Sequence, residues 1–271
     1  MTAPATPLQP PPAAPADAAP WPYPLWIAHR GAGKQAPENT LAAFRLGAAL
    51  GWRMFECDAK LSADEQIILL HDATLDRTTG APGIAGEISW NTLAALDAGA
   101  RHGPDYAGEP LPRLEQIANF VLARGLLLNV EIKPSPGVEA RTGECVARYL
   151  HQRWPREATP PLLTSFKPEA LHAARDAAPA LPRGLLLDTL WGADASGTGL
   201  DWLATARALG CVAVVTRHTL MTAEVRAALR AAGLRALCYT VNDAAEAERL
   251  LALGVDGLIT DEVRRFGPGA R

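Results

Sequence analysis

The chain has 271 residues, 48% of them hydrophobic and 20% charged, a composition that is typical of a globular protein and excludes wholesale disorder. Its formal net charge is −3, so no overall positive field would draw it to nucleic acid or to an anionic membrane. No apolar run approaches the roughly 20 residues that a membrane-spanning helix needs. We therefore expect a soluble protein with no nucleic-acid partner and no stable membrane insertion.

The first 24 residues hold nine prolines and seven alanines and contain no lysine or arginine. This composition predicts a disordered tail over residues 1–24, followed by a single domain over residues 25–271. The tail lacks the basic and apolar regions of a secretory signal, and the four cysteines form no C-x-x-C pair. Cytoplasmic residence with reduced thiols is the resulting expectation, and the sequence leaves the oligomeric state open.

From Trp26 onward, short β-branched or leucine-rich runs alternate with amphipathic stretches, which is typical of repeated βα units around a parallel sheet. The predicted strands are 25–30, 54–60, 67–72, 126–133, 162–166, 184–188, 212–217, 236–241 and 257–261. The predicted helices are 40–50, 114–124, 139–152, 168–176, 202–209, 222–232 and 244–253. The pattern predicts an α/β fold with one strand more than an eight-stranded barrel needs.

The surplus strand has a local explanation in the short connection between the second and third predicted strands. Only a few residues around 62–65 join them, too few for the helical crossover that a parallel pair requires. One of the two strands is therefore expected to run antiparallel. A turn centred between Ala63 and Asp64 would place Glu56 opposite His71.

Residues 73–113 contain two clusters of glycine and proline and form a predicted insertion after the third strand. One short helix is expected in it, near residues 91–96. Long loops at the carboxyl ends of barrel strands often cover a functional site, so the insertion is expected to lie beside one.

The first predicted strand ends in His29-Arg30-Gly31-Ala32-Gly33. This run brings an imidazole, a guanidinium and flexible backbone to the end of the barrel where parallel barrels carry their active sites. Such a group suits an anion. The alternative interpretation is a histidine that only bonds to its neighbours.

Two predicted strands carry acidic residues on one face. Glu56 and Asp58 are two residues apart, and Asn129, Glu131 and Lys133 repeat the arrangement on another strand. Carboxylates on one face repel one another unless a cation binds them, and oxygen ligands suit Mg²⁺, Ca²⁺ or Mn²⁺ rather than zinc. The alternatives are a solvated strand end for the first pair and an isolated buried ion pair for the second set.

A second imidazole, His71, closes the apolar run that precedes it. With His29 it would provide a proton donor and a proton acceptor near neutral pH. A cation, together with the positive charges of Arg30 and Lys133, would stabilise a phosphoryl group. The set therefore favours phosphodiester cleavage over redox chemistry, and no P-loop, dinucleotide-binding fingerprint or serine-hydrolase elbow competes with it.

Several motifs occur together in one order along the chain. They are His29-Arg30-Gly31, Pro37-Glu38-Asn39-Thr40, Glu56-Cys57-Asp58, His71-Asp72, Thr74-Leu75-Asp76-Arg77-Thr78-Thr79, Leu111-Pro112-Arg113-Leu114-Glu115, Glu131-Ile132-Lys133, Ser165-Phe166 and the run from Gly254 to Asp261. In this combination the sequence resembles the glycerophosphodiester phosphodiesterase family of the phospholipase C-like phosphodiesterase superfamily, over about residues 25–265.

The resemblance implies a TIM (β/α)8 barrel with a small insertion after the His71 strand. It also implies a role for each of the residues singled out above. His29 and His71 are the implied acid-base pair, Glu56, Asp58 and Glu131 the ligands of one divalent metal ion (Mg²⁺, Ca²⁺ or Mn²⁺), and Arg30 and Lys133 the phosphate-binding residues.

The implied reaction is hydrolysis of glycerophosphodiesters, such as glycerophosphocholine or glycerophosphoethanolamine, to sn-glycerol 3-phosphate and an alcohol. The implied nucleophile is water, or the glycerol hydroxyl of the substrate acting through a cyclic phosphate. Tyr239 stands where the family often has a tryptophan, so it is expected to contact the substrate in a pocket of altered polarity. The alternatives are lysophospholipase D or phosphatidylinositol phospholipase C-like activity, or a non-catalytic barrel that binds glycerophosphate or a metal.

Overall fold

The computed structural model describes residues 21–190 and 201–267. Within these residues nine strands form one sheet, and eight of them are parallel and close into a barrel, because β1 pairs with both β9 and β2. The strands are β1 (Trp26–Ala28), β2 (Met54–Leu61), β3 (Ile67–Leu69), β4 (Leu127–Ile132), β5 (Leu162–Ser165), β6 (Arg183–Leu187), β7 (Ala213–Arg217), β8 (Arg235–Tyr239) and β9 (Gly257–Thr260). The predicted (β/α)8 barrel is confirmed.

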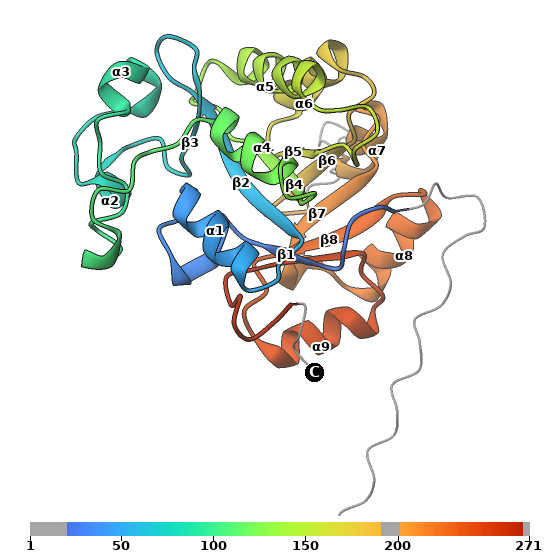
Figure 1. Cartoon of the computed structure of the whole chain (residues 1–271). Helices are drawn as coiled ribbons and strands as arrows, with labels where there is room; N and C mark the ends of the chain where they lie inside the picture. The colour runs from blue at the N-terminus through green and yellow to red at the C-terminus, as the bar shows by residue number, and fades with distance from the viewer. Residues whose placement is uncertain (1–20, 191–200, 268–271) are drawn as a thin grey trace, which may run out of the picture.

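Helices surround the barrel, and the insertion projects from one side of it with two short helices (Figure 1). The helices are α1 (Leu41–Ala49), α2 (Asp76–Thr79), α3 (Trp90–Leu93), α4 (Leu114–Leu122), α5 (Glu139–Arg153), α6 (Pro168–Ala177), α7 (Trp202–Ala208), α8 (Ala223–Ala231) and α9 (Ala244–Ala252), with 3-10 helices η1 (Gly33–Gln35), η2 (Ala85–Glu87), η3 (Pro104–Tyr106) and η4 (His218–Leu220). Each predicted strand and helix is present.

Four of the helices begin at a residue whose side chain accepts a hydrogen bond from the backbone of the first turn. These residues are Thr40, Asp201, Thr222 and Asp243, at the starts of α1, α7, α8 and α9. Such caps satisfy amide groups that a helix leaves without an internal partner. The caps therefore stabilise the first turns of these four helices.

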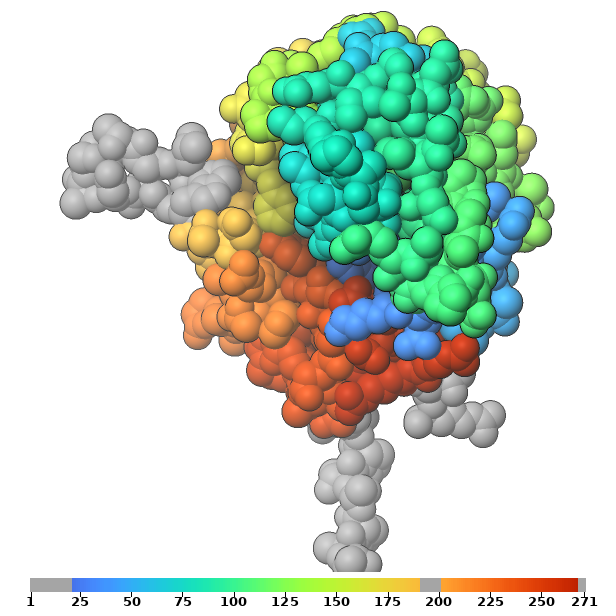
Figure 2. Space-filling view, turned by 90° about the vertical axis from the view of Figure 1, so that its left-hand side faces the viewer, coloured from blue at the N-terminus to red at the C-terminus, as the bar shows by residue number. Residues whose placement is uncertain are grey.

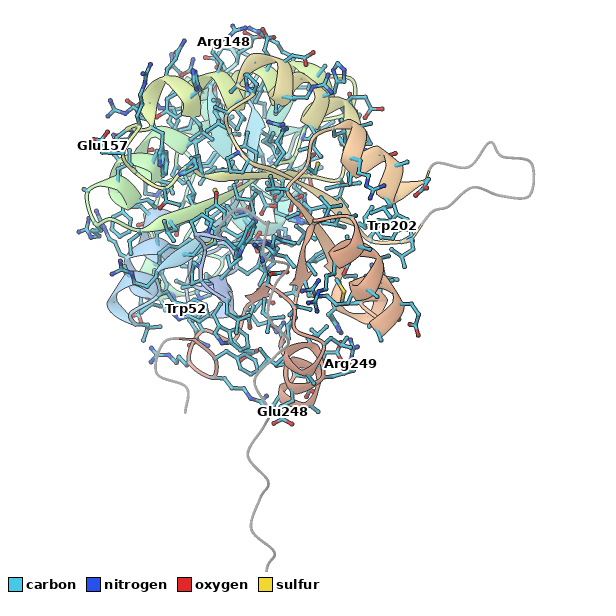
Figure 3. All side chains as sticks on the ribbon, turned by 90° about the vertical axis from the view of Figure 1, so that its right-hand side faces the viewer. Trp52, Arg148, Glu157, Trp202, Glu248 and Arg249 are labelled. Carbon is cyan, nitrogen blue, oxygen red and sulfur yellow. The ribbon has the colours of Figure 1, made fainter. Side chains whose placement is uncertain are left out.

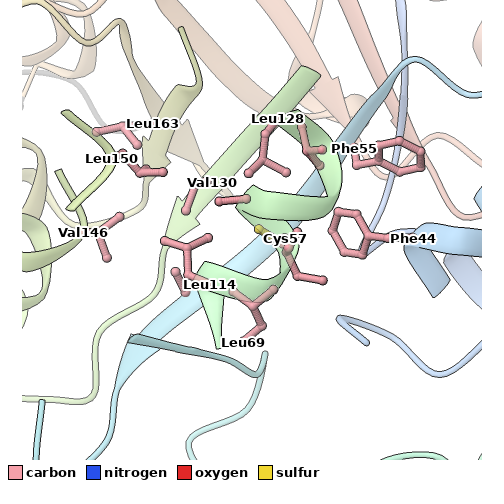
Figure 4. Close-up of a cluster of buried hydrophobic side chains, with 14 of the residues drawn as sticks. Phe44, Phe55, Cys57, Leu69, Leu114, Leu128, Val130, Val146, Leu150 and Leu163 are labelled. Carbon is pink, nitrogen blue, oxygen red and sulfur yellow. The ribbon is translucent and has the colours of Figure 1, made fainter. Parts of the chain in front are cut away.

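Alternation along β2 separates the core from the site. Phe55 and Cys57 face outward and pack among side chains from α1 and α4, including Phe44 and Leu114 (Figure 4). The residues between them face the inside of the barrel. The outward side of β2 therefore stabilises the fold, and its inward side is available for chemistry.

The inside of the barrel changes character along its axis. Toward the amino ends of the strands it is filled by apolar side chains such as Ile27, Met54, Val215 and Leu237, all buried. Toward the carboxyl ends the inward residues are polar or charged. Within the described residues this apolar cluster fills the barrel at the amino ends of the strands, so the polar carboxyl ends are where a ligand is expected to bind.

Charged side chains such as Arg148, Glu157 and Glu248 lie at the outer edge of the molecule (Figure 3). By contrast, Trp52 is 1% exposed and its indole N–H donates to the carbonyl of Val263 at 3.0 Å. This bond ties the segment after β9 to the start of β2, next to the place where the barrel closes.

The hairpin between β2 and β3 is antiparallel, as predicted, but its register differs by one residue from the prediction. Ala59 pairs with Leu69 and Leu61 with Ile67, so the pairing expected between Glu56 and His71 is wrong. The turn spans three residues between Ser62 and Gln66, with Glu65 at a positive φ of 58°. Three-residue hairpin loops of this kind place the centre of the turn on a residue, which shifts every pair by one.

The insertion contains α3 at Trp90–Leu93, slightly earlier than the predicted helix at 91–96, and also α2, which the sequence did not suggest. Of the predicted tail, residues 1–20 lie outside the described residues. Tyr23 is 6% exposed and its hydroxyl donates to the carbonyl of Pro160 at 2.8 Å, so the packed domain begins before residue 25. Within the described residues, every helix is too short or too polar to span a bilayer.

Candidate active site

Three buried carboxylates meet at the carboxyl ends of β2 and β4. Asp58 lies directly opposite Glu131 in the parallel register of the two strands, and Glu56 points to the same face one pleat earlier. One oxygen from each residue lies within 4.8 Å of the others. The predicted metal ligands are therefore brought together, and neighbouring strands are the reason.

Two oxygen atoms of this cluster have no hydrogen-bond partner within the described residues. They are Oε1 of Glu56 and Oδ1 of Asp58, both buried. A buried acceptor without a partner costs free energy, and a pair of buried carboxylates side by side costs more. A divalent cation with oxygen ligands would satisfy both atoms, so the donor set fits such an ion.

The three carboxyl groups have pKa values that differ in direction. Burial and the charge of Asp58 raise the pKa of Glu56 to about 8. Burial, with the same neighbouring charge, also raises the pKa of Glu131. Burial acts in the same direction on Asp58, but the positive charges of Arg30 and Lys133 outweigh it, so the pKa of Asp58 is lowered. Asp58 is therefore the carboxylate that stays ionised most firmly.

Asn39 holds Asp58 in place. Its Nδ2 donates to Oδ2 of Asp58 at 2.8 Å, and its Oδ1 accepts from the backbone N–H of Asp58 at 3.0 Å. The backbone of Asn39 is left-handed, with φ of 62°, a conformation that asparagine tolerates better than most residues. In the sequence, Asn39 stands in the Pro37-Glu38-Asn39-Thr40 motif with no predicted part in the site, because its contact with Asp58 depends on the tertiary structure.

His29 lies between two carboxylates. Its Nδ1 is 2.6 Å from Oδ1 of Asp261, and its Nε2 is 3.7 Å from Oε2 of Glu56. Asn242 in turn donates to the second oxygen of Asp261 at 2.8 Å. Burial acts to lower the pKa of His29, but the hydrogen bond to Asp261 and the charge of Glu56 outweigh it and raise the pKa.

His71 reaches the site because antiparallel β3 runs back along β2 towards Asp58. Its Nδ1 is 2.7 Å from Oδ1 of Asp72. The ammonium of Lys60, a buried residue of β2, donates to the carbonyls of both His71 and Asp72. Burial lowers the pKa of His71, and Arg30 and Lys133 act in the same direction against the charge of Asp58.

The two predicted phosphate-binding residues flank the carboxylates. Nε of Arg30 lies 3.2 Å from Oδ2 of Asp58, and its backbone N–H donates to Glu56 at 3.0 Å. Nζ of Lys133 donates to Oε1 of Glu131 at 2.8 Å and lies 3.5 Å from Oδ1 of Asp58. Both side chains therefore offset part of the negative charge of the carboxylate cluster.

Tyr239, at the end of β8, lies against Phe166 with the two ring planes at 87°. Its hydroxyl donates to the carbonyl of Leu187 at 3.0 Å. The centroid of the Phe166 ring also lies 5.7 Å from Nζ of Lys133, so the two aromatic rings lie next to the charged cluster. Figure 2 shows the molecule hollowed between the insertion and the segments nearer the C-terminus.

A sequence profile of the Glycerophosphoryl diester phosphodiesterase family matches residues 29–265. The chain belongs to this family. The match begins at His29, directly after β1, and includes β2 to β9 and each of the site residues described above.

Individual relatives agree with the profile. A glycerophosphodiester phosphodiesterase of Caldanaerobacter subterraneus subsp. tengcongensis is 30% identical over 242 residues, which cover 88% of this chain and 94% of the relative. One from Bacillus subtilis is 27% identical over 250 residues, 88% of this chain and 83% of the relative. A phosphodiesterase of Oleispira antarctica, solved in complex with the product sn-glycerol-3-phosphate, is 31% identical with a TM-score of 0.82, covering 89% of this chain and 94% of that one. The chain is therefore an enzyme, a phosphodiesterase of the glycerophosphodiester class.

Proposed function

We propose that this enzyme hydrolyses glycerophosphodiesters such as glycerophosphocholine and glycerophosphoethanolamine to sn-glycerol 3-phosphate and an alcohol. Glu56, Asp58 and Glu131 would hold one divalent cation, Mg²⁺, Ca²⁺ or Mn²⁺. His29 and His71 would transfer protons, and Arg30 and Lys133 would bind the phosphate.

One observation carries this proposal. Three buried carboxylates lie beside two histidines, His29 and His71, that each have an aspartate on Nδ1. One oxygen of Glu56 and one of Asp58 have no hydrogen-bond partner within the described residues. When bound, the cation would supply Lewis-acid polarisation of the phosphoryl oxygens. A carboxylate on Nδ1 orients an imidazole and leaves Nε2 to exchange a proton with the substrate.

The surroundings of the two histidines favour different roles. Two carboxylates flank His29, which stabilises its protonated form, so we assign it as the general acid. Arg30 and Lys133 face His71, which stabilises its neutral form, so we assign it as the general base. His71 would take a proton from water or from the glycerol hydroxyl as the new P–O bond forms, and His29 would give a proton to the departing alcohol oxygen as the old bond breaks. Attack by water gives sn-glycerol 3-phosphate directly, whereas attack by the glycerol hydroxyl gives a cyclic phosphate that a water molecule opens to the same product in a second step.

Tyr239 would line the pocket for the alcohol group. Because its hydroxyl is already bonded to a backbone carbonyl, the ring is the surface that it offers to a ligand. An aromatic face favours a cationic head group such as choline or ethanolamine.

The test is release of sn-glycerol 3-phosphate from glycerophosphocholine and glycerophosphoethanolamine, with Mg²⁺, Ca²⁺ or Mn²⁺ added in turn and a chelator as the control. We expect release that needs a divalent ion and falls by at least about 100-fold in His71→Ala and Glu56→Gln. His172→Ala is the matched control, because His172 is an exposed histidine whose Nδ1 lies 3.4 Å from Oδ2 of Asp176. This variant should retain wild-type activity.

Three results would contradict the proposal. Release of sn-glycerol 3-phosphate in the presence of chelator would contradict the metal requirement. Full activity of His71→Ala would contradict the two-histidine mechanism. Absence of release with every ion, from folded protein, would favour lysophospholipid substrates first and the non-catalytic barrel second. Cytoplasmic residence stays a prediction, which cell fractionation would test.

A further inference from the structure

Arg77, in helix α2 of the insertion, binds two carboxylates from different parts of the chain. Its Nη1 and Nη2 donate to the two oxygens of Glu38 at 2.6 and 2.7 Å, and its Nε donates to Oδ2 of Asp72 at 2.5 Å. Only a planar guanidinium can offer a two-pronged contact on one side and a third donor on the other. The side chain nevertheless remains 46% exposed.

Each of these carboxylates has a second partner in the active site. Oδ1 of Asp72 lies 2.7 Å from Nδ1 of His71, the proposed general base. Oε1 of Glu38 also accepts from Nη1 of Arg30 at 2.9 Å, and Arg30 is the proposed phosphate ligand. Arg77 is thus one residue removed from both groups: it reaches His71 through Asp72 and Arg30 through Glu38.

Glu38 and Asp72 come from separate elements, the loop before α1 and the segment after β3. Two carboxylates that converge on one cation repel each other when the cation is removed. Without Arg77, the carboxylate of Asp72 would be free to turn away from His71. The negative charge of Glu38 would then be shared with Arg30 alone, so Glu38 would compete with the substrate phosphate for the Arg30 guanidinium.

We infer that Arg77 is a positioning residue that orients the proposed general base and the proposed phosphate-binding arginine together. It acts through Asp72 on His71 and through Glu38 on Arg30, and so makes the insertion part of the active site. This inference rests on the function proposed above.

The experiment compares Arg77→Ala with Arg141→Ala. Arg141 is a matched control on the outer surface: its side chain is 42% exposed and, like that of Arg77, donates three hydrogen bonds to two carboxylates, Glu65 and Glu144. With glycerophosphocholine as the substrate, we expect Arg77→Ala to lower kcat about 10- to 100-fold and to raise KM, as the loss of an orienting partner commonly does. Arg141→Ala should keep both constants within about twofold of wild type, since an exposed ion pair contributes little.

Two further variants separate orientation from simple loss of stability. Arg77→Lys keeps the charge but not the planar fork, so it should stay at least about fivefold below wild type in kcat/KM while melting close to the wild-type temperature. It also provides the test if Arg77→Ala does not fold. In an Asp72→Asn background, Arg77→Ala should lower kcat much less than it does in wild type, because the two residues act in one chain of contacts.

The possible outcomes are distinct. A wild-type enzyme that hydrolyses no glycerophosphodiester overturns the proposed function, and this inference with it. An active wild type and an inactive His71→Ala, with kinetic constants of Arg77→Ala and Arg77→Lys that match those of Arg141→Ala, overturn the inference alone. Full additivity of Arg77→Ala with Asp72→Asn also overturns it.

Discussion

Asp261 contacts two other side chains at the carboxyl end of the barrel. Its Oδ1 lies 2.6 Å from Nδ1 of His29, and its Oδ2 accepts a hydrogen bond from Nδ2 of Asn242 at 2.8 Å. Burial acts to raise the pKa of Asp261, but the bonds from these two residues outweigh it and lower the pKa to about 2. The carboxylate is therefore an acid-sensitive element of the folded state as well as an orienting group for His29.

The pH dependence of Asp261 has a definite sign. A carboxyl whose pKa is lower in the folded state stabilises the fold above its unfolded pKa of about 3.9, and this contribution is lost as the pH falls towards 2. We expect Asp261→Asn to be less stable than wild type by about 2 kcal/mol at pH 6, with the difference vanishing near pH 2.

Denaturant unfolding of metal-free protein at several pH values between 2 and 7 would measure this difference. Asp105→Asn, a change at an exposed aspartate of the insertion, is the control. A difference between wild type and Asp261→Asn that stays constant down to pH 2 would show that the carboxylate does not act through its charge.

Pairs of elements pack at distances that single glycines determine. Gly143 of α5 lies so close to α6 that a Cβ atom placed there would approach the carbonyl oxygen of Ala170 to 2.1 Å. Because this neighbour is backbone, the helix pair would have to move apart to accommodate a methyl group.

We expect Gly143→Ala to lower the free energy of unfolding by about 1–3 kcal/mol, the usual cost of overpacking. The control is Gly103→Ala, because Gly103 has an extended backbone with φ of 168° and no atom within 4 Å of its Cβ position. Gly103→Ala should be neutral or stabilising by up to about 1 kcal/mol. Urea midpoints of the two variants would decide, and equal midpoints would refute the close approach of α5 and α6.

The sequence predicted these elements well because each depends on local periodicity. The run of β2, for example, alternates between Phe55 and Cys57 outward and Glu56 and Asp58 inward, and the structure has this alternation. The register of the β2–β3 hairpin was not predicted correctly. The turn is one residue longer than expected, with Glu65 at a positive φ, and the alternation of side chains does not indicate the length of a turn.

At the scale of the whole barrel, the proposed metal site would couple ion binding to folding. Its proposed ligands lie on β2 and β4, so a bound ion would join two neighbouring strands of the closed sheet. An ion that binds only the folded state stabilises that state in proportion to its occupancy.

We expect a divalent ion at 100 times its Kd to stabilise the protein by about 2.7 kcal/mol. Glu131→Gln should reduce this gain to near zero, because the ion loses one charged ligand of three. Glu115→Gln, at an exposed carboxylate, should retain it. Thermal melts with and without each ion would measure the effect, and equal gains in Glu131→Gln and wild type would place the ion elsewhere.

The sequence by itself determined the order and type of the elements and indicated which residues would gather at the candidate site, because strand and helix periods and motif spacing are local properties of a chain. The partners of those residues were decided only by the tertiary structure. Asp261 meets His29 across 232 residues, and Arg77 meets Glu38 across 39. Such contacts depend on the closure of the barrel and on the path of the insertion, neither of which any local pattern encodes.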